Sequence, residues 1–237
     1  AAQAAGAQLH EHSPALSMEK AGKDWMVRTA HGQVRAGQVV LAGNSGLLWQ
    51  APQLAPSLHD RIMPVGTYII TTEPLSADQA AELLPSNAAV CDNNFVLDYF
   101  RLSAERRMLF GGRVSYTAAT PSRLTHTMRE RMLRVFPSLQ PTRIDHTWGG
   151  FVDISSQRAP DWGQLAPGVF FVHGFSGHGL AATTLAGRVI RQALMGERHA
   201  LSLFERIRQR PFPGGPAWRI PLLLLGTSYY RLRDWLN

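Results

Sequence analysis

The sequence predicts a mixed α/β protein, in which part of a Rossmann-like domain is joined to a domain built on an antiparallel sheet. Three observations support this fold class. Residues 38–42 form an apolar stretch that runs into a glycine, as a buried parallel strand does. Residues 169–194 have the pattern of a second buried strand, a glycine-rich turn and a helix. Between these segments, residues 61–145 hold short β-branched and aromatic stretches and one helical pattern.

The first sixty residues predict a terminal helical turn and three strands, at residues 1–7, 8–12, 25–29 and 38–42. Gly6 ends the helical turn, and His31 with Gly32 forms a turn after the second strand. A parallel strand at 38–42 needs neighbours on both sides, and we expect the residues that supply them to precede this sequence. The absence of an initial methionine agrees with that expectation.

The middle of the chain predicts a sheet with one exposed face. Strands are expected at residues 65–72, 88–91, 95–102, 107–112 and 147–152. Apolar residues recur near helical spacing across residues 121–136, so one helix is expected to pack on this sheet. Residues 161–168 predict a turn-rich connection, and residues 222–236 predict an amphipathic terminal helix.

The glycine-rich turn at residues 173–179 (HGFSGHG) is the most informative segment. Glycines let the backbone approach a ligand closely, and the N-terminus of the following helix offers unpaired N–H groups and a partial positive charge. Such a turn can stabilise an anionic oxygen. Gly177, Gly179 and Ala182 match a G-x-G-x-x-A pattern, but no second strand with an acidic residue follows, so we do not assign a pyrophosphate site.

Other chemistries are less well supported. Ser176 lies in a glycine turn, but a nucleophile elbow needs a glycine where His178 stands, which argues against a serine hydrolase. His10 and His12 would share one face of a strand, yet no further ligands complete a metal site. No metal is therefore expected.

Composition excludes several classes of protein. The net charge of +7 comes from 24 basic and 17 acidic residues, but almost all basic residues are scattered arginines, which argues against nucleic-acid binding. No apolar run approaches the length of a membrane span, and no secretory signal is visible. The single cysteine, Cys91, fits a reducing compartment, so a cytoplasmic protein is expected.

Four segments together resemble FAD-dependent amine and amino-acid oxidoreductases of the D-amino-acid oxidase family. They are VVLAG at 39–43, WGG at 148–150, RAP at 158–160 and VFFVHGFSGHGLAATTLAG at 169–187. The resemblance implies an FAD-binding domain at residues 1–60 and 146–200, a substrate-binding sheet at 61–145 and a tail at 201–237. The family's amino-terminal G-x-G-x-x-G is absent from this sequence, so the resemblance is to the carboxyl portion.

The resemblance also implies the site residues. Those expected near FAD are Ala15, Ala42, Gly43, Ser176, Gly177, His178, Gly179 and Leu180. The turn would lie beside the flavin ring, where negative charge develops on reduction. Hydride transfer from the amine-bearing carbon to flavin N5 would give an imine that water hydrolyses.

Substrate residues are expected on the sheet and after it. Candidates are Asp98, Tyr99, Arg101 and Arg158, and no catalytic residue is assigned. Val152 stands where amino-acid oxidases of the family carry a carboxylate-binding arginine, which favours an amine such as a gamma-glutamylated polyamine. The alternative is a non-catalytic module that completes a flavin and substrate site only with a partner chain supplying the missing half.

Overall fold

The computed structural model shows two compact units, Ala1–Met63 with Asp153–Pro216 and Pro64–Val152 with Ala217–Asn237. The structure describes residues 1–94, 97–115, 121–213, 215, 218, 221–222, 224–226 and 228, with only the backbone of 113–115. The start of the predicted strand at 95–102 and most of the predicted terminal helix lie outside the described residues. The assignment of separate roles to the domains stays a prediction.

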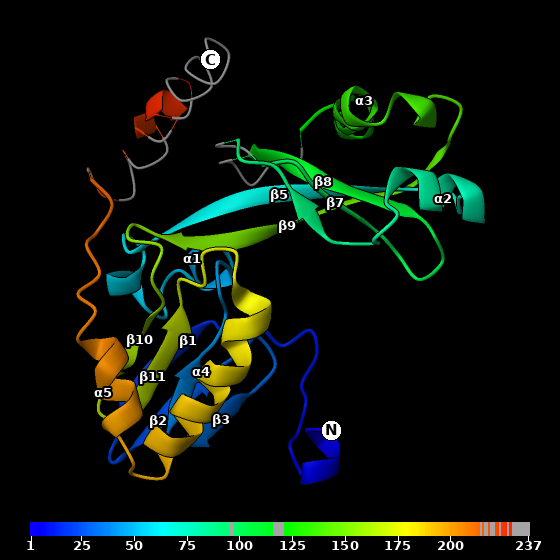
Figure 1. Cartoon of the computed structure of the whole chain (residues 1–237). Helices are drawn as coiled ribbons and strands as arrows, with labels where there is room; N and C mark the ends of the chain where they lie inside the picture. Colours follow the sequence, from blue (N-terminus) through cyan, green and yellow to red (C-terminus); the bar gives the residue numbers. More distant parts are fainter. Residues whose placement is uncertain are drawn as a thin grey trace. The chain divides into compact units, whose positions relative to one another are not determined.

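The first unit is built in three layers around a small sheet in the order β10-β11-β4 (Figure 1). Its strands are β4 (Val39–Leu41), β10 (Asp161–Ala166) and β11 (Val169–His173). β11 runs parallel to β4 and antiparallel to β10. The outer layers and connections comprise η1 (Gln3–Ala5), β1 (Ser17–Ala21), β2 (Asp24–Arg28), β3 (Gln33–Ala36), α1 (Gly46–Trp49), η2 (Pro56–Leu58), α4 (Gly179–Leu194) and α5 (His199–Glu205).

Strand β11 is apolar throughout because both of its faces are covered. Phe170 and Val172 pack against α4 and α5, whereas Val169 and Phe171 pack on the other face with Leu41. This alternation follows from the two-residue period of a strand. The sheet that carries the glycine-rich turn is thereby held from both sides.

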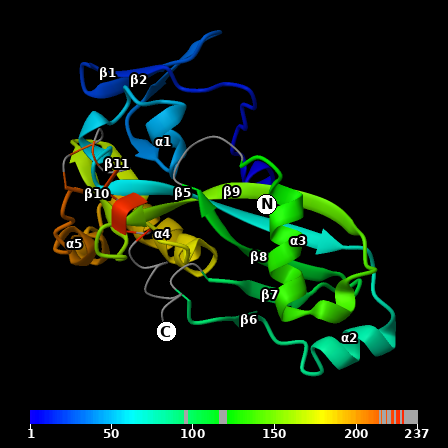
Figure 2. The same ribbon diagram turned by 90° about the horizontal axis from the view of Figure 1, so that it is seen from above.

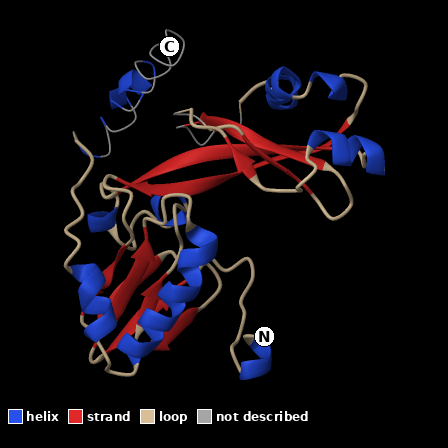
Figure 3. Ribbon diagram, in the orientation of Figure 1, coloured by secondary structure: helices blue, strands red, loops and turns tan. Residues whose placement is uncertain are grey.

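The second unit is a five-stranded sheet in the order β6-β7-β8-β5-β9 with helices on one face (Figures 2 and 3). Its elements are β5 (Ile62–Thr72), α2 (Ala77–Leu83), β6 (Val90–Cys91), β7 (Tyr99–Leu102), β8 (Met108–Ser115), α3 (Leu124–Val135), η3 (Pro137–Leu139) and β9 (Ile144–Ser155). The first two residues of β5 and the last three of β9, which include Asp153, belong to the first unit. The pairs β6–β7, β7–β8 and β8–β5 are antiparallel.

Helix α3 forms the core of this unit with one side of the sheet. Met128 and Met132, one helical turn apart, are fully buried and belong to the same cluster as Ile70, Met108 and Phe110. The mixed α/β fold class and the helix packed on an antiparallel sheet are therefore confirmed.

Some predicted elements are wrong. Residues 8–12 form no strand, and β1 and β3, which flank β2, were missed. Residues 161–166 are strand β10 rather than a turn-rich connection. Gly163 in this strand has a packing reason, because a Cβ there would lie 3.2 Å from the ring of Phe171.

Candidate functional site

The glycine-rich turn and the Ala42–Gly43 segment meet at one edge of the sheet. They follow the carboxyl ends of β11 and β4, which are adjacent parallel strands. Ligands of open α/β sheets bind in the crevice outside the carboxyl ends of such strands. The structure thus brings together the predicted residues of the two segments. Ala15 lies separately, half-buried in the loop before β1.

The turn has a left-handed backbone at three of its residues. The φ angles of Gly174, Ser176 and Gly177 are 75°, 53° and 90°. A Cβ at Gly174 would lie 3.1 Å from the backbone nitrogen of Asp161, so this position needs glycine for space as well as for φ. Gly177, by contrast, faces open space.

Helix α4 begins at this turn with its N-terminus uncapped by a side chain. His178 is the N-cap residue but makes no side-chain cap, and the first hydrogen bond back into the turn runs from the Ala182 N–H to the His178 carbonyl. The N–H groups of residues 179–181 therefore point beyond the helix end, where the helix dipole adds partial positive charge. Leu180 is 96% exposed beside them.

A buried acid lies beneath the turn. Asp153 accepts hydrogen bonds from the N–H groups of Gly174 and Phe175, and its carbonyl accepts one from Ser176. Burial raises the pKa of the Asp153 carboxyl above its usual range, opposed by its backbone hydrogen bonds and by nearby His173.

The side chain of Ser176 points into the protein. Its Oγ accepts a hydrogen bond from the Ser155 N–H at 3.2 Å and bonds the Gly174 carbonyl. Ser176 is 4% exposed. Of the predicted cofactor residues in the turn, Ser176 can therefore offer only its backbone, whereas Gly177 and His178 are exposed.

A second buried pair stands next to the turn. Nε2 of His173 lies 2.6 Å from Oδ2 of Asp161, whose other oxygen is 3.4 Å from Nη1 of Arg61. Sequence reasoning missed Asp153, Asp161 and the structural use of His173. The sequence does offer one signal for Asp153, which directly follows the uncharged residues 147–152. This signal is weak, because acidic residues are common on protein surfaces.

The predicted substrate residues lie in different surroundings. Tyr99 is on the sheet face opposite α3, where its hydroxyl lies 2.8 Å from Oγ1 of Thr67 and its ring covers Gly111. Arg101 shares that face by strand alternation and is exposed.

Asp98 is paired with an arginine, whereas Arg158 is exposed in the first unit. Asp98 forms an ion pair of 2.6 Å with Arg131 of α3, and burial raises its pKa against the effect of that arginine. Arg158 belongs to the first unit and stands exposed in a turn with φ of 61°. Contact of Asp98, Tyr99, Arg101 and Arg158 with a substrate stays a prediction.

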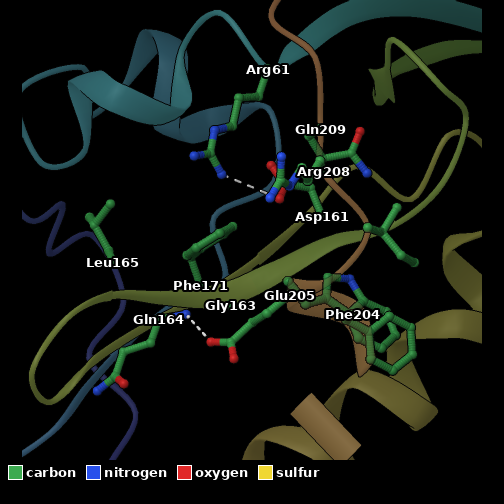
Figure 4. Close-up of a pocket in the computed structure, with 12 residues that line it drawn as sticks. Arg61, Asp161, Gly163, Gln164, Leu165, Phe171, Phe204, Glu205, Arg208 and Gln209 are labelled. Atoms are coloured by element: carbon green, nitrogen blue, oxygen red, sulfur yellow. Dashed lines mark hydrogen bonds and ion pairs between the residues drawn. The ribbon is translucent and has the colours of Figure 1, made fainter. Parts of the chain in front are cut away.

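Two cavities of the first unit adjoin this sheet. An apolar groove of about 220 Å³ runs between α4 and the exposed edge of β4, lined by Val40, Ala42, Val172, Phe175, Thr183, Ala186, Gly187 and Ile190. A larger cavity of about 540 Å³ lies along β10 (Figure 4). There Asp161 pairs with Arg61, and Glu205 accepts the Gln164 N–H (Figure 4). Because these acids already have partners, the open turn is the better candidate for a cofactor.

Metal and membrane sites receive no support from the described residues. Among them, no group of three or more histidine, cysteine or acidic side chains could hold a metal ion. No helix in the described part of the chain is long and apolar enough to cross a membrane.

Comparisons with known proteins give the family of the chain. Residues 1–193 match the family DAO, described as "FAD dependent oxidoreductase". The chain is 42% identical over 212 residues to "Gamma-glutamylputrescine oxidoreductase" of Escherichia coli (strain K12), covering 90% of this chain and 49% of the relative. It is 36% identical over 229 residues to "Probable oxidoreductase OrdL" of Haemophilus influenzae, covering 97% and 52%. The chain thus spans about half the length of these relatives.

Solved structures show the same fold. L-proline dehydrogenase from P. horikoshii superposes with a TM-score of 0.69 at 20% identity, covering 88% of this chain and 58% of that one. Glycine oxidase from Geobacillus kaustophilus superposes with a TM-score of 0.70 at 18% identity, covering 86% and 54%.

Proposed function

This chain belongs to the DAO family of FAD-dependent oxidoreductases, and from that premise we propose that it forms the flavin-ring and substrate side of an amine oxidoreductase. The observation that carries the proposal is the glycine-rich turn, which opens at the carboxyl ends of two parallel strands in front of the uncapped helix α4. This arrangement suits a flat, apolar ring that gains negative charge on reduction.

The turn fits a flavin in space and in polarity. Gly177 has nothing within 4 Å of a Cβ position, and Gly179 has only the Phe175 Cβ at 3.8 Å. Both glycines therefore leave room for a ring against the backbone. The N–H groups of residues 179–181 would supply hydrogen-bond donors to the ring's N1 and C2 oxygen region, and exposed Leu180 would supply apolar contact.

When bound, FAD would supply the two-electron oxidation of a C–N bond of the substrate by hydride transfer, and water would hydrolyse the resulting imine. The residues of this chain would hold the cofactor and orient the substrate. We propose Ala42, Gly43, Gly177, His178, Gly179 and Leu180 as cofactor contacts, with Ser176 acting through its backbone and Ala15 near the adenine. Tyr99 and Arg101 are proposed to face the substrate.

A gamma-glutamylated amine is the proposed substrate class. Support comes from the printed name of the relative that is 42% identical, and from Val152, which leaves no arginine for a carboxylate at that position. Asp98 is a weaker candidate for the amine, because its carboxylate already pairs with Arg131. Arg158 is kept as a candidate for a remote carboxylate of the substrate.

Flavin binding is proposed to need an amino-terminal half, in the same polypeptide or on a separate one. β4 is the edge of its sheet, and Val40 on it is 37% exposed toward the apolar groove. An edge strand presents unpaired N–H and C=O groups, so a further strand from the amino-terminal half could pair with β4 and extend this sheet.

The test is to prepare the chain alone and together with a polypeptide that carries a G-x-G-x-x-G half. We expect a flavin absorption spectrum only for the combination, with bleaching on anaerobic addition of a gamma-glutamylated diamine. A simple amino acid serves as the control substrate. A combination that folds and binds no flavin would refute the proposal.

A further inference from the structure

Asp153 bonds three consecutive N–H groups of the glycine-rich turn. Its carboxylate accepts the N–H of Gly174 and, at 3.1 Å, the N–H of Phe175, while its carbonyl oxygen accepts the N–H of Ser176 at 2.9 Å. Asp153 is 1% exposed. One residue at the end of β9 therefore fixes the direction of the whole inner side of the turn.

This arrangement leaves the outer N–H groups of the turn and helix directed outward. The His178 N–H bonds the Phe175 carbonyl, and the Ala182 N–H bonds the His178 carbonyl. Among the residues that the structure describes, no acceptor bonds the N–H groups of residues 177 and 179–181. The N–H groups of residues 174–176 therefore bond the protein interior, whereas those of residues 177 and 179–181 face outward.

Two features of the turn cost stability. Ser176 holds a left-handed backbone with φ of 53°, which is unfavourable for a residue with a Cβ. A buried carboxylate is also costly, and burial raises the pKa of Asp153. Strained residues persist where the surroundings hold them in place, and they gather at functional sites.

We infer that Asp153 is a positioning residue, which holds the turn in the shape that presents its outer N–H groups to the flavin before the cofactor binds. This inference rests on the proposed function and adds a residue that the expected site did not include. A turn ordered in advance pays less conformational entropy when a ligand binds, so its loss lowers affinity.

Asp153→Asn tests the inference with little change in shape. The amide keeps one acceptor oxygen and replaces the other with a donor that cannot bond an N–H group. We expect faster amide hydrogen exchange at residues 174–176 in the chain without FAD, and at least tenfold weaker FAD binding after addition of the amino-terminal half. Far-ultraviolet circular dichroism should stay unchanged. The matched control is Asp24→Asn, which removes the charge that Asp24 on β2 offers to Arg35 on β3, in the same unit but away from the turn.

The two readouts separate the inference from the proposed function. Unchanged amide exchange in a folded Asp153→Asn protein would refute the claim that Asp153 holds the turn. Faster exchange with unchanged FAD affinity would refute the claim that Asp153 positions the turn for the flavin. Failure of the wild type to bind FAD would instead refute the proposed function.

Asp153→Glu provides a second test if Asp153→Asn does not fold. Glutamate keeps the charge, but its extra methylene group moves the carboxylate away from the N–H groups of Gly174 and Phe175. We expect faster exchange at residues 174 and 175 and FAD binding weakened several-fold, and unchanged exchange or unchanged affinity would overturn the inference.

Discussion

Replacing Gly179 by leucine is expected to remove flavin binding while the fold stays intact. A Cβ at this position meets one atom, the Phe175 Cβ at 3.8 Å, which is ordinary van der Waals contact. Gly179 is also the first residue of α4 and does not have a positive φ. Since leucine favours a helix over glycine by up to about 1 kcal/mol, the free energy of unfolding should change by no more than about 1 kcal/mol.

The effect on the cofactor should be much larger. A branched side chain at Gly179 would occupy the space proposed for the flavin ring, and we expect at least about 100-fold weaker FAD binding, or about 2.8 kcal/mol. Gly179→Ala should give a smaller loss in the same direction. Affinity is measured by quenching of flavin fluorescence in the chain combined with its amino-terminal half, and stability by urea unfolding.

The matched control is Gly32→Leu. Gly32 lies in the turn between β2 and β3, has open space around its Cβ position and does not have a positive φ. This variant should keep both stability and FAD affinity. If Gly179→Leu bound FAD within twofold of the wild type, the placement of the turn against the flavin would be refuted.

Four further predictions concern stability, each measured by urea unfolding of the folded chain. Met128→Ala, which empties a fully buried site, should lower the free energy of unfolding by about 2–5 kcal/mol, and no loss would contradict the assigned core. Arg131→Gln removes the ion pair of partly buried Asp98 and should cost about 1–3 kcal/mol; an equal loss in a background that already carries Asp98→Asn would exclude the pair as the cause. The pKa of Asp153 is raised above its ordinary value of 3.8, so relative to Asp153→Asn the wild type should gain stability as pH falls through that raised pKa toward 3.8. The pKa of Asp145 is lowered by its hydrogen bond from an arginine, so the stability it supplies should be lost as pH falls below 3.8, and the same sign at both aspartates would contradict this reasoning.

Much of the fold followed from local patterns. The strand–turn–helix at residues 169–194 was predicted from a continuous apolar run, glycines and helical spacing, and the structure has β11 and α4 there. Helix α3 followed from apolar spacing in the same way. These elements were predictable because their burial pattern has the period of the element itself.

Elements that depend on a partner were not predictable. Residues 8–12 alternate as a strand does, but no strand in the described part of the chain pairs with them. Strand β10 contains a glycine that indicates a turn by sequence, although the glycine is there for the ring of Phe171 from β11. Whether each segment forms a strand depends on pairing with another strand, and residues nearby in sequence do not reveal that pairing.

The sequence by itself determined the fold class, the resemblance to FAD-dependent oxidoreductases and the turn at which a flavin is expected. Only the tertiary structure decided how that turn is held. It turned the Ser176 side chain inward, brought Asp153 from β9 beneath the turn and paired Asp98 with Arg131. The physical reason is that glycines and periodicity act over a few residues, whereas a buried acid finds its hydrogen-bond partners only when distant segments fold together.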